Sequence, residues 1–101
     1  MTYRPIRTDE EQQQVDDLLP QLFGLVKVTK LDGTEIVGLA NLGTGQGEEG
    51  PFAHVVLTIL DGQRVDVDLL DIATVVSAFL EHRAAFVAAG IMDLSGSPTV
   101  H

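Results

Sequence analysis

The spacing of apolar residues changes along the chain, and each spacing predicts a different kind of element. Within residues 8–20, Val15 and Leu18 follow the spacing of three and four that is typical of an amphipathic helix. Thr8 and Glu11 form a capping-box pattern, and acidic residues fill the first turn, where the helix dipole favours them. The sequence therefore predicts a helix over about residues 8–20 that packs one face on the rest of the domain.

From Phe23 onward the spacing changes to two and β-branched residues become frequent, which is typical of strands. Val26 and Val28 alternate with polar residues, and an Asp-Gly pair at residues 32–33 supplies a hairpin turn. Gly38 has no side chain to pack, so it predicts a sharp bend or the close approach of another backbone. The predicted strands begin at residue 23 and then cover residues 34–39, 52–60, 63–69 and 72–76.

The longest stretch without apolar periodicity lies between the second and third predicted strands. Residues 43–51 read Gly-Thr-Gly-Gln-Gly-Glu-Glu-Gly-Pro, and we expect them to form a flexible acidic loop. Residues 45–50 match the letters of a dinucleotide-binding fingerprint, but Pro51 and a strand follow instead of the helix that would hold a pyrophosphate. No cofactor is therefore predicted.

A second helix is predicted over about residues 77–89, which are rich in helix formers and precede Gly90, a residue suited to the backbone conformation past a helix end. The apolar residues of this helix exceed what a small barrel can easily cover. The sequence therefore predicts an interaction surface formed by Phe79, Phe86 and Val87.

Together these elements predict a mainly β fold with flanking helices: an N-terminal helix, a five-stranded, highly bent antiparallel barrel over about residues 23–76, and a C-terminal helix. With 101 residues, of which 45% are apolar, the chain has the size and composition of a single domain. Residues 95–101 are expected to form a loose tail. Because so small a domain buries little surface by itself, self-association is favoured.

Charge and cysteine content narrow the classes of partner. Six Lys and Arg against fifteen Asp and Glu give a net charge of −9, which repels phosphate backbones and anionic lipid headgroups over a Debye length of about 8 Å. The absence of cysteine excludes a disulfide framework and a thiolate zinc site. The sequence opens without a signal-peptide pattern, and no apolar stretch approaches the roughly 18 residues of a membrane span. We therefore expect a cytoplasmic protein that binds neither DNA nor membranes.

The run from Val26 to Leu39, Val-Lys-Val-Thr-Lys-Leu-Asp-Gly-Thr-Glu-Ile-Val-Gly-Leu, resembles the first motif of Sm-like proteins. That motif pairs a strand and an Asp-Gly or Asn-Gly turn with a glycine five residues after the turn glycine, as Gly33 and Gly38 are here. The order of elements is also similar to that of small bacterial proteins of uncharacterised function with a variant Sm-like fold. The resemblance implies a small Sm-like or SH3-like barrel.

The chain departs from RNA-binding Sm proteins at the positions that matter for RNA. Those proteins carry an Asp and an Asn after the bending glycine and a basic element between the fourth and fifth strands. Here Asn41 does not occupy the motif position, and Asp71 stands near where a cation would be expected. The resemblance therefore does not extend to the nucleotide pocket.

Two groups of side chains are candidates for chemistry. Asp66 and Asp68 share a strand face and Asp71 lies just beyond, so the three could meet at a calcium or magnesium ion. Their spacing matches no established loop, and a solvated sheet face beside Arg64 explains them without a metal.

His54 could serve as an acid–base group, but no nucleophile accompanies it in the sequence, so we expect a hydrogen-bonded strand histidine. No catalytic or metal-binding residues are predicted.

The folded body has few cations, namely Lys27, Lys30, Arg64 and Arg83. Nucleic-acid binding would need several of them clustered beside aromatic platforms. With one Tyr and no Trp, such platforms are scarce. We therefore predict a non-catalytic self-association or protein-interaction module, for which a homodimer is the favoured assembly and an open sheet edge offers a route to pairing. An RNA-binding Sm-type ring is the alternative.

Overall fold

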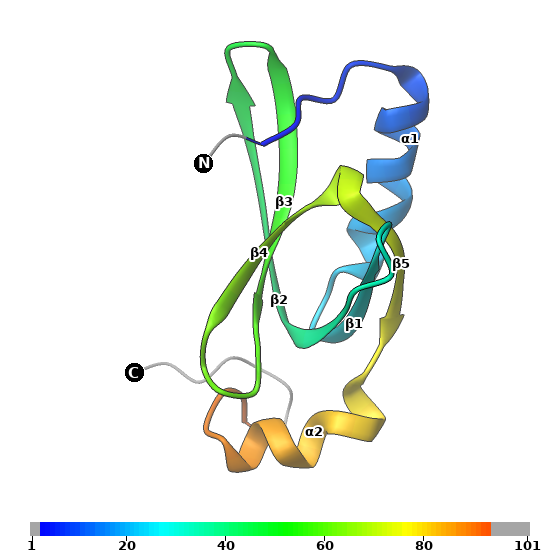
Figure 1. Cartoon of the computed structure of the whole chain (residues 1–101). Helices are drawn as coiled ribbons and strands as arrows, with labels where there is room; N and C mark the ends of the chain where they lie inside the picture. Colours follow the sequence, from blue (N-terminus) through cyan, green and yellow to red (C-terminus); the bar gives the residue numbers. More distant parts are fainter. Residues whose placement is uncertain (1–2, 94–101) are drawn as a thin grey trace.

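The structure is a computed structural model that describes residues 3–93 of the chain as one antiparallel sheet flanked by helices (Figure 1). The predicted tail, residues 95–101, lies outside the described residues. The strands are β1 Leu25–Lys30, β2 Glu35–Gly47, β3 Gly50–Thr58, β4 Arg64–Asp68 and β5 Ile72–Ser77. The helices are α1 Asp9–Leu18 and α2 Phe79–Ala88, with short 3₁₀ turns η1 Leu19–Gln21 and η2 Leu69–Asp71.

Helix α1 begins at the capping box that the sequence predicts. Thr8 N donates to Glu11 Oε1 and Glu11 N donates to Thr8 Oγ1, each at 3.1 Å. Val15 and Leu18 are buried against the sheet, which confirms the predicted apolar face. Pro20 lies in the first turn of η1, where its missing N–H costs no hydrogen bond, so the α-helix ends and a tighter turn follows.

The strands pair in the order β4-β3-β2-β1-β5, and every pairing is antiparallel. Within the described residues no ladder joins β4 to β5, so the sheet is strongly bent but remains open, with these two strands at its edges. A Cβ atom added to Gly38 would lie 2.9 Å from Leu57 Cβ, which confirms the close approach predicted at this glycine. The predicted fold class is confirmed, with an open sheet in place of a closed barrel.

The prediction of a flexible loop over residues 43–51 is wrong. β2 and β3 continue their ladder through this segment to a tight turn, and the resulting hairpin projects beyond the rest of the sheet (Figure 1). Gly43 and Gly45 stand opposite His54 and Phe52, and a Cβ on either glycine would approach the opposing ring to 2.4 Å. These glycines therefore make room for aromatic rings across the ladder, a requirement that the local sequence pattern does not report.

Two hydrophobic clusters hold the domain together. The first lies between α1, η2 and the inner face of the bent sheet, and its members with no exposed surface are Val28, Val55, Leu57 and Leu69. The second lies between α2 and the outer face of β1 and β2, and its buried members are Leu25, Leu39, Ala78, Phe86 and Met92. The sheet is therefore covered on both faces near its middle strands.

Helix α2 packs its apolar residues on its own domain. Phe86 is only 2% exposed, and Phe79 and Val87 are partly buried beside it. The assignment of Phe86 to an interaction surface is therefore corrected: it is a core residue, because Leu25 and Leu39 present a second apolar patch that the helix covers. A role for Phe79 and Val87 in contact with a partner stays a prediction.

Candidate functional site

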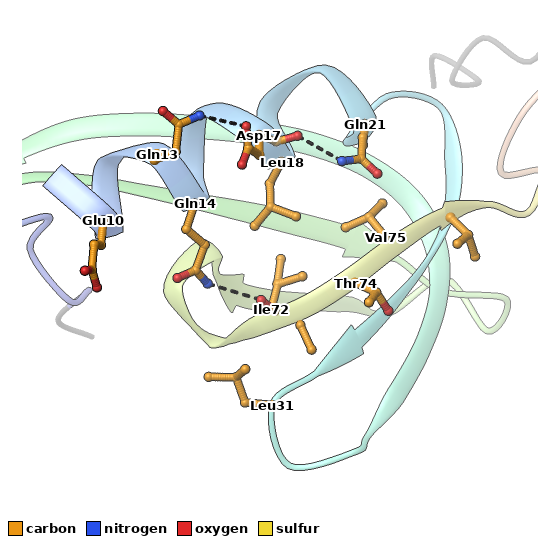
Figure 2. A pocket seen from close by; sticks show the side chains of 12 residues that line it. Glu10, Gln13, Gln14, Asp17, Leu18, Gln21, Leu31, Ile72, Thr74 and Val75 are labelled. Carbon is orange, nitrogen blue, oxygen red and sulfur yellow. Dashed lines mark hydrogen bonds between the residues drawn. The ribbon is translucent and has the colours of Figure 1, made fainter.

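A groove of about 870 Å³ runs between α1 and the edge strand β5 (Figure 2). Leu18 from α1 and Ile72 and Val75 from β5 form its apolar floor, and all three are buried. Glu10 and Asp17 stand on the helical side of the groove. The groove therefore combines an apolar floor with an acidic rim.

The backbone of β5 is open on the side that faces the groove. At its start, Gln14 Nε2 donates to Ile72 O at 3.2 Å, so a side chain of α1 satisfies this edge carbonyl. Beyond Ile72, β5 pairs only with β1 among the described residues. Its sequence, Ile-Ala-Thr-Val-Val-Ser, contains none of the charges or prolines that commonly block the addition of a further strand. Exposed apolar side chains also lie at the groove, since Val76 is 51% and Leu31 64% exposed.

A second site lies on the outer face of the β2–β3–β4 end of the sheet. Phe52 and His54 lean over the glycine positions of β2, and their rings, 6.2 Å apart and tilted by 44°, form an aromatic platform. The Tyr3 ring stacks on both, with ring centroids 5.0 Å from Phe52 and 4.2 Å from His54. Offset stacking of this kind adds to the free energy of burying aromatic surface.

One carboxylate contacts both His54 of the platform and the tyrosine. His54 Nδ1 lies 2.8 Å from Asp66 Oδ1, and Tyr3 donates its hydroxyl hydrogen to the other oxygen of Asp66. Because an ionised carboxylate only accepts hydrogen bonds, the proton of His54 lies on Nδ1 in this pair. The hydrogen bond to Asp66, followed by desolvation and the negative charges of Asp66 and Asp68, raises the pKa of Tyr3 above its ordinary value of 10.0.

The titration of this phenol gives a direct prediction. Since the folded-state pKa of Tyr3 is raised, its contribution to stability is present below pH 10 and is lost as the pH rises through the folded-state pKa. Tyr3 is the chain's one tyrosine, so alkaline absorbance follows it alone. We expect an apparent pKa above 10.0 that falls in Asp66→Asn and not in Asp16→Asn, where the removed charge lies on α1. Equal pKa values in the three proteins would contradict the contact.

The three aspartates considered as cation ligands are engaged with protein groups. Asp66 holds Tyr3 and His54, Asp68 accepts hydrogen bonds from Arg4 N at 2.6 Å and from Leu70 N, and Asp71 pairs with Arg4. Among the described residues, no group of three or more His, Asp or Glu side chains could hold a metal ion. His54 takes the hydrogen-bonded role that the sequence predicts.

Sequence reasoning missed the part that Tyr3 plays. Its partners Phe52, His54 and Asp66 come from distant strands, and an isolated tyrosine before a helix carries no periodic signal. The sequence holds no signal for this role, because the partial burial of the Tyr3 ring, which favours a hydrogen-bond partner, is a property of the fold.

The cations considered for nucleic-acid binding are dispersed. Lys27 and Lys30 lie on β1, Arg64 begins β4 and Arg83 lies on α2. Lys27 pairs with a glutamate at 3.1 Å, and Arg83 lies 5.6 Å from the centre of a phenylalanine ring. Of the two helices in the part of the chain that the structure describes, neither is long and apolar enough to cross a membrane.

Comparison with known proteins shows the fold alone. The sequence matches no protein-family model and no curated protein sequence. Among solved structures, the chain is similar to XC5848 from Xanthomonas campestris, whose crystal structure adopts a novel variant of the Sm-like motif. The two are 20% identical with a TM-score of 0.51, over 75% of this chain and 96% of XC5848. The chain therefore has a variant Sm-like fold, as its sequence motif predicts.

Proposed function

We propose that this domain is a non-catalytic self-association module in which two copies pair through their β5 edges. The observation that carries the proposal is the open, uncharged edge of β5 beside a groove with an apolar floor. An unpaired strand edge presents a row of backbone donors and acceptors, and another strand satisfies them at little cost in conformational entropy.

Pairing of two β5 strands about a two-fold axis satisfies both open edges with the same contacts. Such an isologous contact closes after two copies, which favours a dimer over a filament. The exposed side chains of Val76 and Leu31 lie where a second sheet would cover them. The net charge of −9 on each copy opposes association at long range, so raising the salt concentration should strengthen the dimer.

The variant Val76→Lys tests this interface. We expect it to weaken dimerisation about tenfold or more, because each copy would place a cation in an apolar contact, where the two cations would face each other across the two-fold axis. Val76 is half-exposed in the isolated chain, so the fold should tolerate the change. Sedimentation velocity over a concentration series measures the dissociation constant.

Leu60→Lys is the matched control, because Leu60 is also an exposed apolar residue and the substitution changes the net charge equally. Leu60 lies between β3 and β4, away from β5, so the substitution should leave the dimer intact. A wild-type chain that stays monomeric at high concentration, or equal weakening by both variants, would show that β5 is not the interface.

An RNA-binding ring remains the alternative function, which the Sm-like fold motivates and the negative charge opposes. The same sedimentation experiment addresses it when labelled single-stranded RNA is added at near-physiological salt. A species larger than a dimer that carries the RNA would favour the ring. A dimer that leaves the RNA free would favour the self-association module.

A further inference from the structure

Residues 3–7 form a strap that crosses the β2–β3 hairpin before the chain enters α1 (Figure 1). Ile6 N donates to Pro51 O at 2.7 Å, and Arg4 N donates to Asp68 Oδ2 at 2.6 Å. The strap has no regular secondary structure of its own. Its conformation therefore depends on the surface beneath it.

Three side chains of the strap meet matching groups on that surface. Tyr3 stacks on the aromatic platform and donates to Asp66. Arg4 Nη1 donates to Asp71 at 2.8 Å. Arg7 Nη2 donates to Glu49, in the turn of the hairpin, at 2.6 Å.

Each of these side chains faces a partner of matching chemistry. Tyr3 faces the aromatic platform, the adjacent Arg4 faces a carboxylate, and Arg7, three positions later, faces a second carboxylate. Aromatic surfaces and charge-assisted Arg–carboxylate hydrogen bonds both recur in the recognition of short peptide segments, and this surface offers both.

The strap is held loosely enough to be exchanged. None of residues 3–7 is fully buried, and of these Ile6 alone packs beside the first core. The two arginine pairs are largely exposed, and exposed ion pairs typically contribute about 1 kcal/mol or less. Release of the strap would uncover Phe52 and His54 and remove Ile6 from the first core, while the buried side chains of both clusters keep their contacts with one another.

From these contacts we infer that the platform of Phe52 and His54, with Asp66, Asp68, Asp71 and Glu49, is a recognition site for an extended segment of another protein. The segment carries a tyrosine followed by arginine, with a second basic residue three positions later. Residues 3–7 are its competitor within the chain. The site is separate from the β5 edge, so it stands whether or not the domain dimerises through that edge.

A peptide with the sequence of residues 2–8 is the probe. The variant Tyr3→Ala/Arg4→Ala weakens the strap and removes the chain's one tyrosine, and the chain has no Trp. Tyrosine fluorescence then reports the peptide alone. We expect a saturable change in that fluorescence when the variant is titrated into the peptide, and weaker binding to the intact chain, observed by heteronuclear NMR, because its own strap occupies the site.

Substitutions in the site distinguish recognition from general attraction between a basic peptide and an acidic protein. In the Tyr3→Ala/Arg4→Ala background, Asp66→Asn should weaken binding about tenfold or more, because a charged hydrogen-bond acceptor is lost. Asp16→Asn removes the same charge from α1 and should leave binding unchanged. Far-UV circular dichroism establishes that each variant is folded before binding is measured.

The proposal fails if the peptide gives no saturable change with the folded double variant. It also fails if a scrambled peptide of the same composition binds equally, or if Asp66→Asn and Asp16→Asn weaken binding to the same extent. Equal affinity for the intact chain and the double variant would show that residues 3–7 are not the competitor.

Discussion

Phe86→Ala is expected to lower the free energy of unfolding by roughly 3 to 5 kcal/mol. Phe86 is 2% exposed and lies at the centre of the second core, between α2 and the outer face of the sheet. Removal of the ring leaves a cavity among Leu25, Leu39 and Met92, whose backbones are fixed by the sheet and by the turn after α2. A domain this small has a total stability of only about 5 to 15 kcal/mol, so the variant should unfold at much lower denaturant concentration.

Leu80→Ala is the matched control on the same helix. Leu80 is 93% exposed, so its truncation should change the unfolding free energy by no more than about 0.5 kcal/mol. Urea denaturation followed by circular dichroism measures both variants. If Phe86→Ala changed dimerisation but not stability, the ring would belong to an interface, and its place in the second core would be wrong.

This contrast shows what local composition can and cannot say. The helix formers of residues 77–89 and the glycine after them correctly predict a helix, because helix propensity and helix termination depend on neighbouring residues. They do not say which of the apolar side chains another part of the domain covers. Phe86 and Leu80 are both large and apolar, and only the position of Leu25 and Leu39 on the outer side of the sheet decides that one is buried and the other exposed.

Local chemistry predicted the elements whose ends are fixed by neighbouring residues. Thr8 and Glu11 cap α1 through each other, and the turn between β1 and β2 is held by Thr34 N, which donates to Asp32 Oδ1 at 2.9 Å. This bond also lowers the pKa of Asp32. Such interactions span a few residues, so a sequence displays them directly.

The long hairpin and the strap could not be predicted in this way. Glycine is frequent in loops, so Gly43 and Gly45 favour a loop prediction. The rings of His54 and Phe52, which require these glycines, lie on the opposite strand. Tyr3 meets Asp66 across most of the chain length. The candidate peptide site depends entirely on these distant contacts. The sequence predicts an open sheet edge, but only the order in which the strands pair identifies β5 as one of the edge strands.

Gly38→Val is expected to destabilise the domain by about 3 kcal/mol or more. The first added atom would lie 2.9 Å from Leu57 Cβ and 3.0 Å from Thr58 O, both too close for a relaxed contact. Leu57 has no exposed surface and cannot rotate away, so β2 and β3 would have to separate at the bend. That separation breaks packing in the first core, which makes this glycine the residue that allows the sheet to curve.

Gly47→Ala separates this steric cause from the general effect of replacing a strand glycine. Gly47 lies at the end of the same strand, and its added Cβ would find its nearest neighbour at 3.5 Å, an ordinary contact. Because alanine restricts the unfolded chain, we expect no loss of stability or a gain of about 0.4 to 1 kcal/mol. Thermal and urea unfolding of both variants measure the difference. Equal losses at the two positions would mean that the sheet does not depend on close backbone contact at Gly38, and the bend would then have to originate in the packing of α1 against the inner face.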